Sequence, residues 1–260
     1  MKKYVICLWV IIAIFLSISF ADWKNYTPDI KQLYISKNRS VPDIQSLVKT
    51  KSIKKALSSL KKYCKENYLW EKKFLLTFDD GPHSDITPKV LEILDENNVN
   101  AVFFVLWKNI LKNPSLIKEI TKQGHILWNH SFTHRSFKNL SKNETKQEIK
   151  STNSLINSTL WYNYPIELFR PPYWKVNDHL DKILEQKDLV NCFWNFDSLD
   201  WQKEDLGVEK EKIKDNIKEQ LSKEMQNWRI ILFHDVEKIT PELMEFLIKS
   251  LKEKWYKSVF

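Results

Sequence analysis

The amino-acid sequence predicts an α/β fold in which six or seven strands, each followed by a helix, form a closed or nearly closed (β/α) barrel. Two observations predict this fold. From residue 74 onward, short apolar runs alternate with segments of helical periodicity, which is the pattern of a largely parallel sheet covered by helices. The chain has 260 residues and is 43% hydrophobic, which suffices for one large catalytic domain with a sizeable core. Catalytic groups are then expected at the C-terminal ends of the strands.

The expected elements follow one another in a regular order. Pro88 and Pro241 each follow a threonine, which predicts first-turn prolines behind the N-caps Thr87 and Thr240. The expected strands are residues 74–78, 101–107, 125–129, 167–170, 189–196 and 230–233, with 257–260 as a weak last strand. The expected helices are residues 87–97, 114–123, 140–160, 178–186, 209–225 and 241–255.

The first 21 residues have the pattern of a targeting segment. Lys2 and Lys3 precede an apolar run over residues 4–20, and Ser19-Phe20-Ala21 supplies the small residues of a cleavage site. We therefore expect a signal peptide cleaved after Ala21. The alternative is an uncleaved membrane anchor, because this run is at the short limit for a spanning helix. Either way, the protein is expected to be exported to the periplasm, the cell envelope or the medium.

The net charge of +8 comes from a basic extension over residues 22–73, whereas residues 74–260 carry a net charge of −2. The extension shows helical periodicity in places and no alternation of strands and helices. Its positive charge could attract it to an anionic envelope polymer or a membrane surface, and a solvated linker is the alternative. The barrel has no basic stripe interleaved with aromatic residues, so no nucleic-acid partner is expected, and we expect a monomer.

Counts of two residue types limit the possibilities further. The chain has only three glycines, too few for the glycine-rich phosphate loops of nucleotide-binding enzymes. Of its three cysteines, Cys7 lies in the targeting segment, which leaves Cys64 and Cys192. These two could form one disulfide in an oxidising compartment, or they could stay unpaired with Cys192 as a core residue.

Polar side chains gather where the predicted strands end. In a barrel of parallel strands these positions meet at one face, which makes a ring of aspartate, histidine and arginine a candidate active site. The ring consists of Asp79 and Asp80 after the first strand, His130 and His134 after the third, Arg170 after the fourth, Asp197 and Asp200 after the fifth, and His234 and Asp235 after the sixth.

Part of this ring predicts a metal site. His130 and His134 are four residues apart, so both imidazoles can reach one cation from one face of a helical turn. Two surface histidines at this spacing are common, and the carboxylates of Asp79 and Asp80 at another strand end strengthen the prediction. Two histidines and Asp80 would leave coordination positions open, which suits one divalent ion such as zinc, with cobalt or nickel as other possibilities.

The remaining residues of the ring suit acid–base chemistry. If Asp80 binds the metal, Asp79 is free to act as a general base on water, and Arg170 can orient Asp79 and lower its pKa. The alternative is that the aspartate pair caps the following helix. His234 is a candidate general acid that Asp200 could tune, and the alternative for His234 is a structural role in the core.

Five segments in order resemble the motifs of the polysaccharide deacetylases, the NodB-homology proteins of carbohydrate esterase family four. The resemblance covers residues 74–260 and implies a distorted (β/α) barrel. It also implies metal-dependent removal of acetyl from GlcNAc or MurNAc residues in peptidoglycan, chitin or a related polymer. The segments are Thr77-Phe78-Asp79-Asp80-Gly81-Pro82, His130-Ser131-Phe132-Thr133-His134, Arg170-Pro171-Pro172-Tyr173, Asp197-Ser198-Leu199-Asp200-Trp201 and Ile231-Leu232-Phe233-His234-Asp235.

The resemblance also implies a role for each residue at a matching position. Asp79 would be the base, positioned by Arg170, and the metal ligands would be Asp80, His130 and His134. A second set would complete the site. In it, His234 is the acid, Asp200 supports His234, the backbone N–H of Tyr173 binds the oxyanion, and Trp201 and Leu232 line the pocket for the acetyl methyl group.

One residue departs from the family pattern. Trp174 stands where the family usually has glycine after the Arg-Pro-Pro-Tyr segment. A positive φ at this position would strain the backbone of an aromatic residue, and the oxyanion-side loop could then differ in conformation. Trp174 could equally add a surface on which a sugar ring stacks. The alternatives to an active deacetylase are a non-catalytic glycan-binding protein on the same fold and a hydrolase of small amides.

Overall fold

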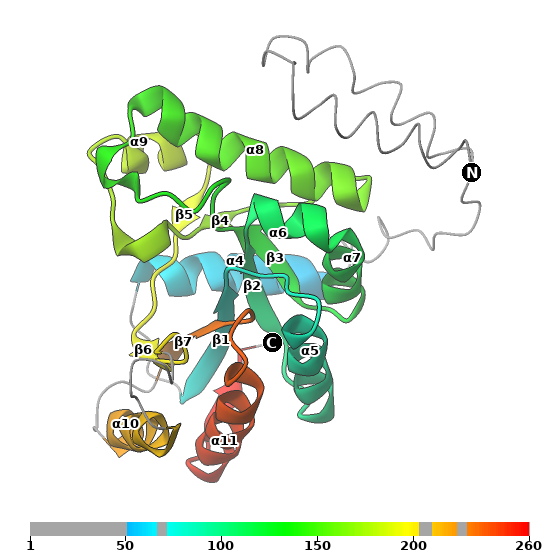
Figure 1. Ribbon diagram of the computed structural model, residues 1–260, viewed down its shortest axis with the longest axis vertical. Helices are drawn as coiled ribbons and strands as arrows, with labels where there is room; N and C mark the ends of the chain where they lie inside the picture. Colours follow the sequence, from blue (N-terminus) through cyan, green and yellow to red (C-terminus); the bar gives the residue numbers. More distant parts are fainter. Residues whose placement is uncertain (1–50, 67–71, 203–209, 223–227, 260) are drawn as a thin grey trace, which may run out of the picture. The chain divides into compact units, whose positions relative to one another are not determined.

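The sheet is built around β1 (Lys73–Asp79), which pairs in parallel with β2 (Ala101–Val105) on one side and β7 (Trp228–His234) on the other. The computed structural model describes residues 51–66, 72–202, 210–222 and 228–259 (Figure 1). The strand order is β5-β4-β3-β2-β1-β7-β6, and β8 also pairs with β1. The other strands are β3 (Ile126–Asn129), β4 (Leu168–Phe169), β5 (Val190–Asn191), β6 (Phe196–Asp197) and β8 (Lys257–Ser258).

These pairings confirm the predicted fold class, a distorted barrel of about seven parallel strands. β5 and β6 lie at the two ends of the strand order, and the barrel is open between them. The described helices are α4 (Lys51–Glu66), α5 (Ile86–Glu96), α6 (Trp107–Lys112), α7 (Pro114–Lys122), α8 (Lys142–Leu160), α9 (Leu180–Glu185), α10 (Lys210–Ser222) and α11 (Thr240–Glu253).

The targeting segment expected over residues 1–21, and most of the expected extension over 22–73, lie outside the described residues. Within the part of the chain that is described, no helix combines the length and the apolar character needed to cross a membrane.

The two faces of the sheet carry different side chains because successive residues of a strand point to opposite sides. On β1, Phe74, Leu76 and Phe78 are buried in the core cluster that also contains the apolar residues of α5 and α11. Leu75 belongs to a second cluster on the other face. Asp79 has the same parity as Leu75, so the first motif delivers its carboxylate to the inner face of the barrel.

Helix α4 contributes to this inner cluster. Leu60 and Cys64 of α4 are buried with Leu75, Trp128 and other inner-face residues of the strands. A disulfide bond joins Cys64 to Cys192, 128 residues later in the sequence and directly after β5. Of the two alternatives for these cysteines, the structure therefore shows the paired state, which ties the end of the basic extension to the barrel.

The strand predicted over residues 189–196 is wrong, because this apolar run contains two short strands at opposite edges of the sheet. β5 pairs with β4, and β6 pairs with β7. The residues between them cross the opening of the barrel, and Asn195 joins β7 by backbone and side-chain hydrogen bonds to Ile230. The strand predicted over 101–107 is too long as well, since β2 ends at Val105 and helix α6 begins at Trp107.

The threonine N-caps are also corrected by the structure. Pro88 and Pro241 do lie in the first turns of α5 and α11, but those helices already begin at Ile86 and Thr240, with Asp85 and Ile239 as N-caps. The two threonine hydroxyls instead bind buried carboxylates. Thr87 Oγ1 donates to Asp235 Oδ2, and Thr240 Oγ1 donates to Asp200 Oδ2, each at 2.5 Å.

Candidate active site

The loop after β1 places two consecutive carboxylates at the end of the central strand. Asp79 is the last residue of β1 and is buried, and Asp80 follows with a φ of 74°. The Asp80 carbonyl accepts a hydrogen bond from Asn109 Nδ2 at 2.6 Å, which fixes this left-handed turn. A Cβ atom at Gly81 would overlap the carboxylate of Asp235, so the close approach of these two segments requires glycine.

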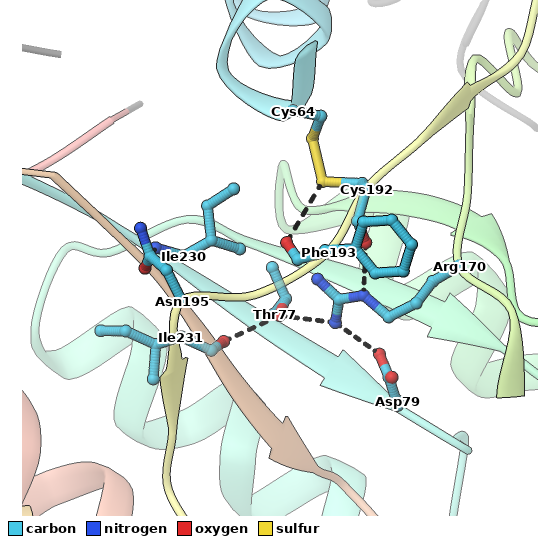
Figure 2. The surroundings of a disulfide bond; sticks show 9 residues. All are labelled: Cys64, Thr77, Asp79, Arg170, Cys192, Phe193, Asn195, Ile230 and Ile231. Atoms are coloured by element: carbon cyan, nitrogen blue, oxygen red, sulfur yellow. Dashed lines mark hydrogen bonds and ion pairs between the residues drawn. A yellow bond between two sulfur atoms is a disulfide. The ribbon is translucent and has the colours of Figure 1, made fainter. Parts of the chain in front are cut away.

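Asp79 is held by a buried arginine. Arg170 follows β4 directly, is fully buried, and donates from Nη1 to Asp79 Oδ1 and Thr77 Oγ1, both at 2.8 Å. Its Nε donates to the carbonyl oxygen of Cys192 at 2.7 Å (Figure 2). Burial lowers the pKa of the Arg170 guanidinium, and the charge and hydrogen bond of Asp79 oppose this shift. Arg170 remains a cation, because an arginine side chain is not deprotonated in proteins.

Three potential metal ligands converge beside this ion pair. Asp80 Oδ1 lies 3.1 Å from His134 Nε2 and 3.5 Å from His130 Nε2. Ligand atoms bound at about 2.0–2.2 Å to one tetrahedral Zn²⁺ lie about 3.3–3.6 Å apart, close to these separations. Asp80 Oδ1 is buried and accepts no hydrogen bond from the described residues. This donor set therefore fits a divalent cation, and it is the group of ligand atoms that the described residues bring within 4.8 Å of one another.

The protonation of two ligands agrees with metal binding. Burial raises the pKa of Asp80, but the imidazole of His134 at 3.1 Å and the rings of His130 and His234 outweigh burial and hold the pKa well below its usual range. Burial lowers the pKa of His130, against the charges of Asp79 and Asp80. The His130 Nδ1 atom lies 2.8 Å from the carbonyl oxygen of Arg170. Since a carbonyl only accepts, Nδ1 carries the proton and Nε2 presents its lone pair toward Asp80.

The loop between the two histidines is organised by Glu148, a buried residue of α8 that the sequence did not single out. Its carboxylate accepts hydrogen bonds from the backbone N–H groups of Phe132 and Thr133 at 2.9 and 2.8 Å, and from Thr133 Oγ1 at 2.6 Å. The His134 backbone has a φ of 62°. Glu148 thus satisfies the buried donors of a loop whose shape brings both imidazoles to one side.

His234 and Asp200 form the second charged pair of the site. His234 Nδ1 donates to Asp200 Oδ1 at 2.8 Å, and the His234 backbone N–H donates to Asp200 Oδ2 at 2.6 Å. Thr240 Oγ1 supplies a further hydrogen bond to Oδ2. Burial lowers the pKa of His234, but the charge and hydrogen bond of Asp200, together with Asp79 and Asp80, raise it to about 10. These contacts leave Nε2 as the other protonated nitrogen of the ring.

Two residues expected in the substrate pocket follow Arg170 in the chain. Tyr173 is 60% exposed, and its ring centroid lies 4.7 Å from that of His134. Trp174 is half exposed, stacks on Phe193 with ring centroids 4.6 Å apart, and contacts the edge of Trp194. Its φ of 55° shows that the position does require left-handed backbone, which costs a residue other than glycine about 1–2 kcal/mol.

The other two expected pocket residues lie on the opposite side of β1, at the ends of β6 and β7. Trp201 is half exposed, and its Nε1 donates to Asp197 Oδ1 at 3.3 Å. Leu232 is buried two residues before His234 and therefore shares its face of β7. The structure thus joins five residues of the predicted ring in one group, namely Asp79, Asp80, His130, His134 and Arg170, and it joins His234 to Asp200 in a second. Asp197 instead binds Trp201, and Asp235 binds Thr87.

The sequence analysis assigned no role in the site to three residues that support it. Thr77, Glu148 and Thr240 each bind a residue of the charged set or its loop. Thr77 carries a signal that could have found it, since it lies two residues before Asp79 and so faces the same side of β1. No such signal marks Glu148, because an acidic residue in an amphipathic helix is usually exposed to solvent.

Comparisons with known proteins identify the family of the chain. Residues 67–191 match the family model of polysaccharide deacetylases. A peptidoglycan-N-acetylglucosamine deacetylase of Bacillus cereus is 30% identical over 185 residues, which cover 70% of this chain and 82% of that protein. The chain belongs to the polysaccharide deacetylase family. The resemblance expected from the five motifs is thereby confirmed.

Other members of the polysaccharide deacetylase family are longer or differ in activity. The peptidoglycan-N-acetylglucosamine deacetylase PgdA of Listeria monocytogenes is 32% identical over 188 residues, and the match spans 72% of this chain but only 38% of that protein. Among solved structures, the peptidoglycan deacetylase PdaC from Bacillus subtilis has a TM-score of 0.62 at 30% identity, covering 73% of this chain and 87% of that chain. A CE4 family pseudoenzyme from Bacillus anthracis has a TM-score of 0.64 at 26% identity, covering 73% of this chain and 63% of that chain.

Proposed function

We propose that this chain is a metal-dependent carbohydrate N-deacetylase that hydrolyses the N-acetyl group of GlcNAc or MurNAc residues in an envelope polymer, with a chitin-like polymer as the other substrate. The observation that carries the proposal is the donor set of Asp80, His130 and His134, which lies beside an aspartate held by arginine, while a histidine held by aspartate ends the neighbouring strand β7. The names of relatives that act on peptidoglycan support the substrate class.

Asp80, His130 and His134 would hold one divalent cation, with zinc as the first candidate and cobalt or nickel as others. When bound, the cation supplies Lewis acidity that activates water and polarises the amide carbonyl. Asp79 is the proposed base. Its Oδ1 is occupied by Arg170, whereas its Oδ2 lies 3.7 Å from His130 Nε2 and thus faces the donor set. Oδ2 is therefore the oxygen that takes the proton of the attacking water.

His234 is the proposed acid. Asp200 holds its Nδ1, so the Nε2 proton is the one that can pass to the amide nitrogen as the C–N bond breaks. The products are acetate and a free amine on the sugar. The backbone N–H of Tyr173 would stabilise the oxyanion, and Trp201 and Leu232 would enclose the acetyl methyl group.

Trp174 is proposed to bind a neighbouring sugar ring of the polymer. One face of its indole is backed by Phe193, and half of the side chain is exposed. A rigid aromatic surface of this kind suits the apolar face of a pyranose. The enzyme is proposed to act outside the cytoplasm, directed there by residues 1–21, with the basic extension near an anionic envelope surface.

The test is acetate release by purified residues 22–260 from chitooligosaccharides and from peptidoglycan, with added zinc or cobalt. Release that stops on chelation and returns with metal supports the proposal. The matched control is His134→Ala, which should bind no metal and release no acetate. Stoichiometric metal binding without acetate release from any N-acetylated glycan would contradict it. Glycan affinity that survives chelation would then favour a non-catalytic binding protein; one structural neighbour is itself described as a pseudoenzyme.

A further inference from the structure

The orientation of Arg170 toward Asp79 depends on a backbone atom from another part of the chain. The guanidinium is fully buried and has three hydrogen-bond acceptors, namely Asp79 Oδ1, Thr77 Oγ1 and the carbonyl oxygen of Cys192 (Figure 2). Two of these acceptors come from β1. The third comes from the segment after β5. A planar guanidinium fixed at both Nη1 and Nε cannot rotate, so the Cys192 carbonyl helps to set its direction.

The two sides of this arrangement differ in their support. On the β1 side, Thr77 Oγ1 donates to the carbonyl oxygen of Ile231 at 2.7 Å, and the strand is flanked by β2 and β7. On the other side, β5 is a two-residue strand at the edge of the sheet, paired with β4. Its ladder ends with the Cys192 N–H donating to Phe169 O at 3.0 Å, and the next residues have no regular structure.

The disulfide bond restrains Cys192, the residue whose carbonyl oxygen contacts Arg170. Figure 2 shows the bond running from Cys192 to Cys64 on α4, while the carbonyl oxygen of the same Cys192 faces Arg170. α4 is itself anchored, because Leu60 and Cys64 are buried in the inner cluster. The exposed ion pair between Lys61 and Asp188 also joins α4 to the turn before β5, although such a surface pair contributes little.

We propose that the Cys64–Cys192 disulfide is a positioning element for the reaction. It fixes the carbonyl that orients Arg170, and through Arg170 it keeps Asp79 in the position that proton abstraction requires. The role of Asp79 in this statement rests on the proposed function, whereas the effect on Arg170 does not. Helix α4 lies outside the segment that matches the family, residues 67–191, so this chain would support a family arginine with a part of its own extension.

The first experiment compares wild type with Cys64→Ala, which breaks the bond but keeps Cys192, and with the double variant Cys64→Ala/Cys192→Ala. We expect kcat for acetate release to fall on the order of 10- to 100-fold, the size of a small misplacement of a catalytic group. KM and bound metal per chain should change little. The control is Leu247→Ala on α11, buried on the outer face, which destabilises the fold but should leave kcat unchanged below its melting temperature.

The second experiment follows the environment of the Arg170 side chain by NMR and does not depend on turnover. The Arg170 Nε–H gives a ¹H–¹⁵N signal that is assigned by its loss in Arg170→Lys. Breaking the disulfide should shift this signal and accelerate its hydrogen exchange, and Leu247→Ala should not shift it. An unchanged Arg170 signal or an unchanged kcat in folded Cys64→Ala overturns the proposal. If wild type releases no acetate from any glycan, the proposed function fails, and the Arg170 signal alone then decides this inference.

Discussion

Asp79 and His234 are directly paired across the sheet, as Cα partners at the ends of the parallel strands β1 and β7. The proposed base and the proposed acid are therefore held at a separation that the sheet ladder sets, on one face of the barrel. Their supporting partners, Arg170 and Asp200, approach from strands on opposite sides of β1. This arrangement allows the roles of the individual residues to be separated by experiment.

The roles of the two consecutive aspartates should separate cleanly. Asp79→Asn should keep the metal, because the donor set is Asp80, His130 and His134, and should lower kcat on the order of 10²–10⁴-fold, as loss of a general base does. Asp80→Asn should lose the metal and the activity together. Metal content by mass spectrometry, measured beside acetate release, distinguishes the two. Metal loss in Asp79→Asn with retention in Asp80→Asn would reverse the assignment.

The pH dependence of kcat/KM should be bell-shaped, with His234 on the alkaline limb. As the acid, His234 must be protonated, so activity falls as the pH rises through its pKa, which its surroundings raise to about 10. Asp200→Asn removes the negative charge that raises this pKa, so the alkaline limb should move to lower pH. His234→Asn should cost on the order of 10²–10⁴-fold in rate and abolish that limb. Nearly full activity of His234→Asn with an unchanged profile would show a purely structural histidine.

The buried carboxyl of Asp235 should make the metal-free protein less stable as the pH rises. Burial raises its pKa from 3.8 to about 7, with the charges of Asp80 and Asp79 adding to the effect against the hydrogen bond from Thr87. A pKa raised on folding gives a stabilisation that is complete below about pH 4 and is lost by about pH 7. Asp235→Asn should therefore gain stability relative to wild type between pH 4 and 8 in chemical denaturation. A constant difference would refute the shifted pKa.

Trp174→Gly should weaken glycan binding without weakening the fold. Glycine relieves the left-handed backbone, which offsets the lost packing on Phe193, so the free energy of unfolding should change by about 1 kcal/mol or less. KM for long chitooligosaccharides should rise several-fold, whereas kcat should not change. Trp255→Gly is the matched control, since Trp255 also has a positive φ, of 66°, and is 82% exposed after α11. Equal KM values for both variants would exclude a sugar-binding role for Trp174.

Local pattern was sufficient for much of the fold and for the charged residues of the candidate site. Apolar β-rich runs such as that ending at Asp79 define buried parallel strands, and polar residues directly after them must meet at one face. The pattern could not show where a continuous apolar run changes partners. Residues 189–196 have the pattern of one strand because β5 and β6, at the two edges of the opening, both carry buried apolar side chains.

The local sequence pattern also could not predict contacts between residues far apart in the sequence. Nothing in the sequence near Cys64 or Cys192 indicates that a helix of the extension packs against the inner face of the barrel. A disulfide between residues 128 positions apart could therefore be predicted only as one of two alternatives. Thr87 and Thr240 show the same limit. Their position before a proline is typical of N-caps, and only the fold reveals that their hydroxyls serve Asp235 and Asp200 instead.

Because β1 pairs with strands that are far apart in the sequence, the residues of the candidate site are synthesised at very different times. β2 follows β1 closely, but β7, its other neighbour, ends at His234, about 150 residues later. Asp80, His130 and His134 are all synthesised before any residue of β7. A prematurely terminated chain that stops between them would carry the three donor residues without the acid, and one edge of the apolar strand β1 would lack its partner. Such a fragment could compete for metal and would be prone to aggregate through that edge, so incomplete synthesis is a hazard specific to this strand order.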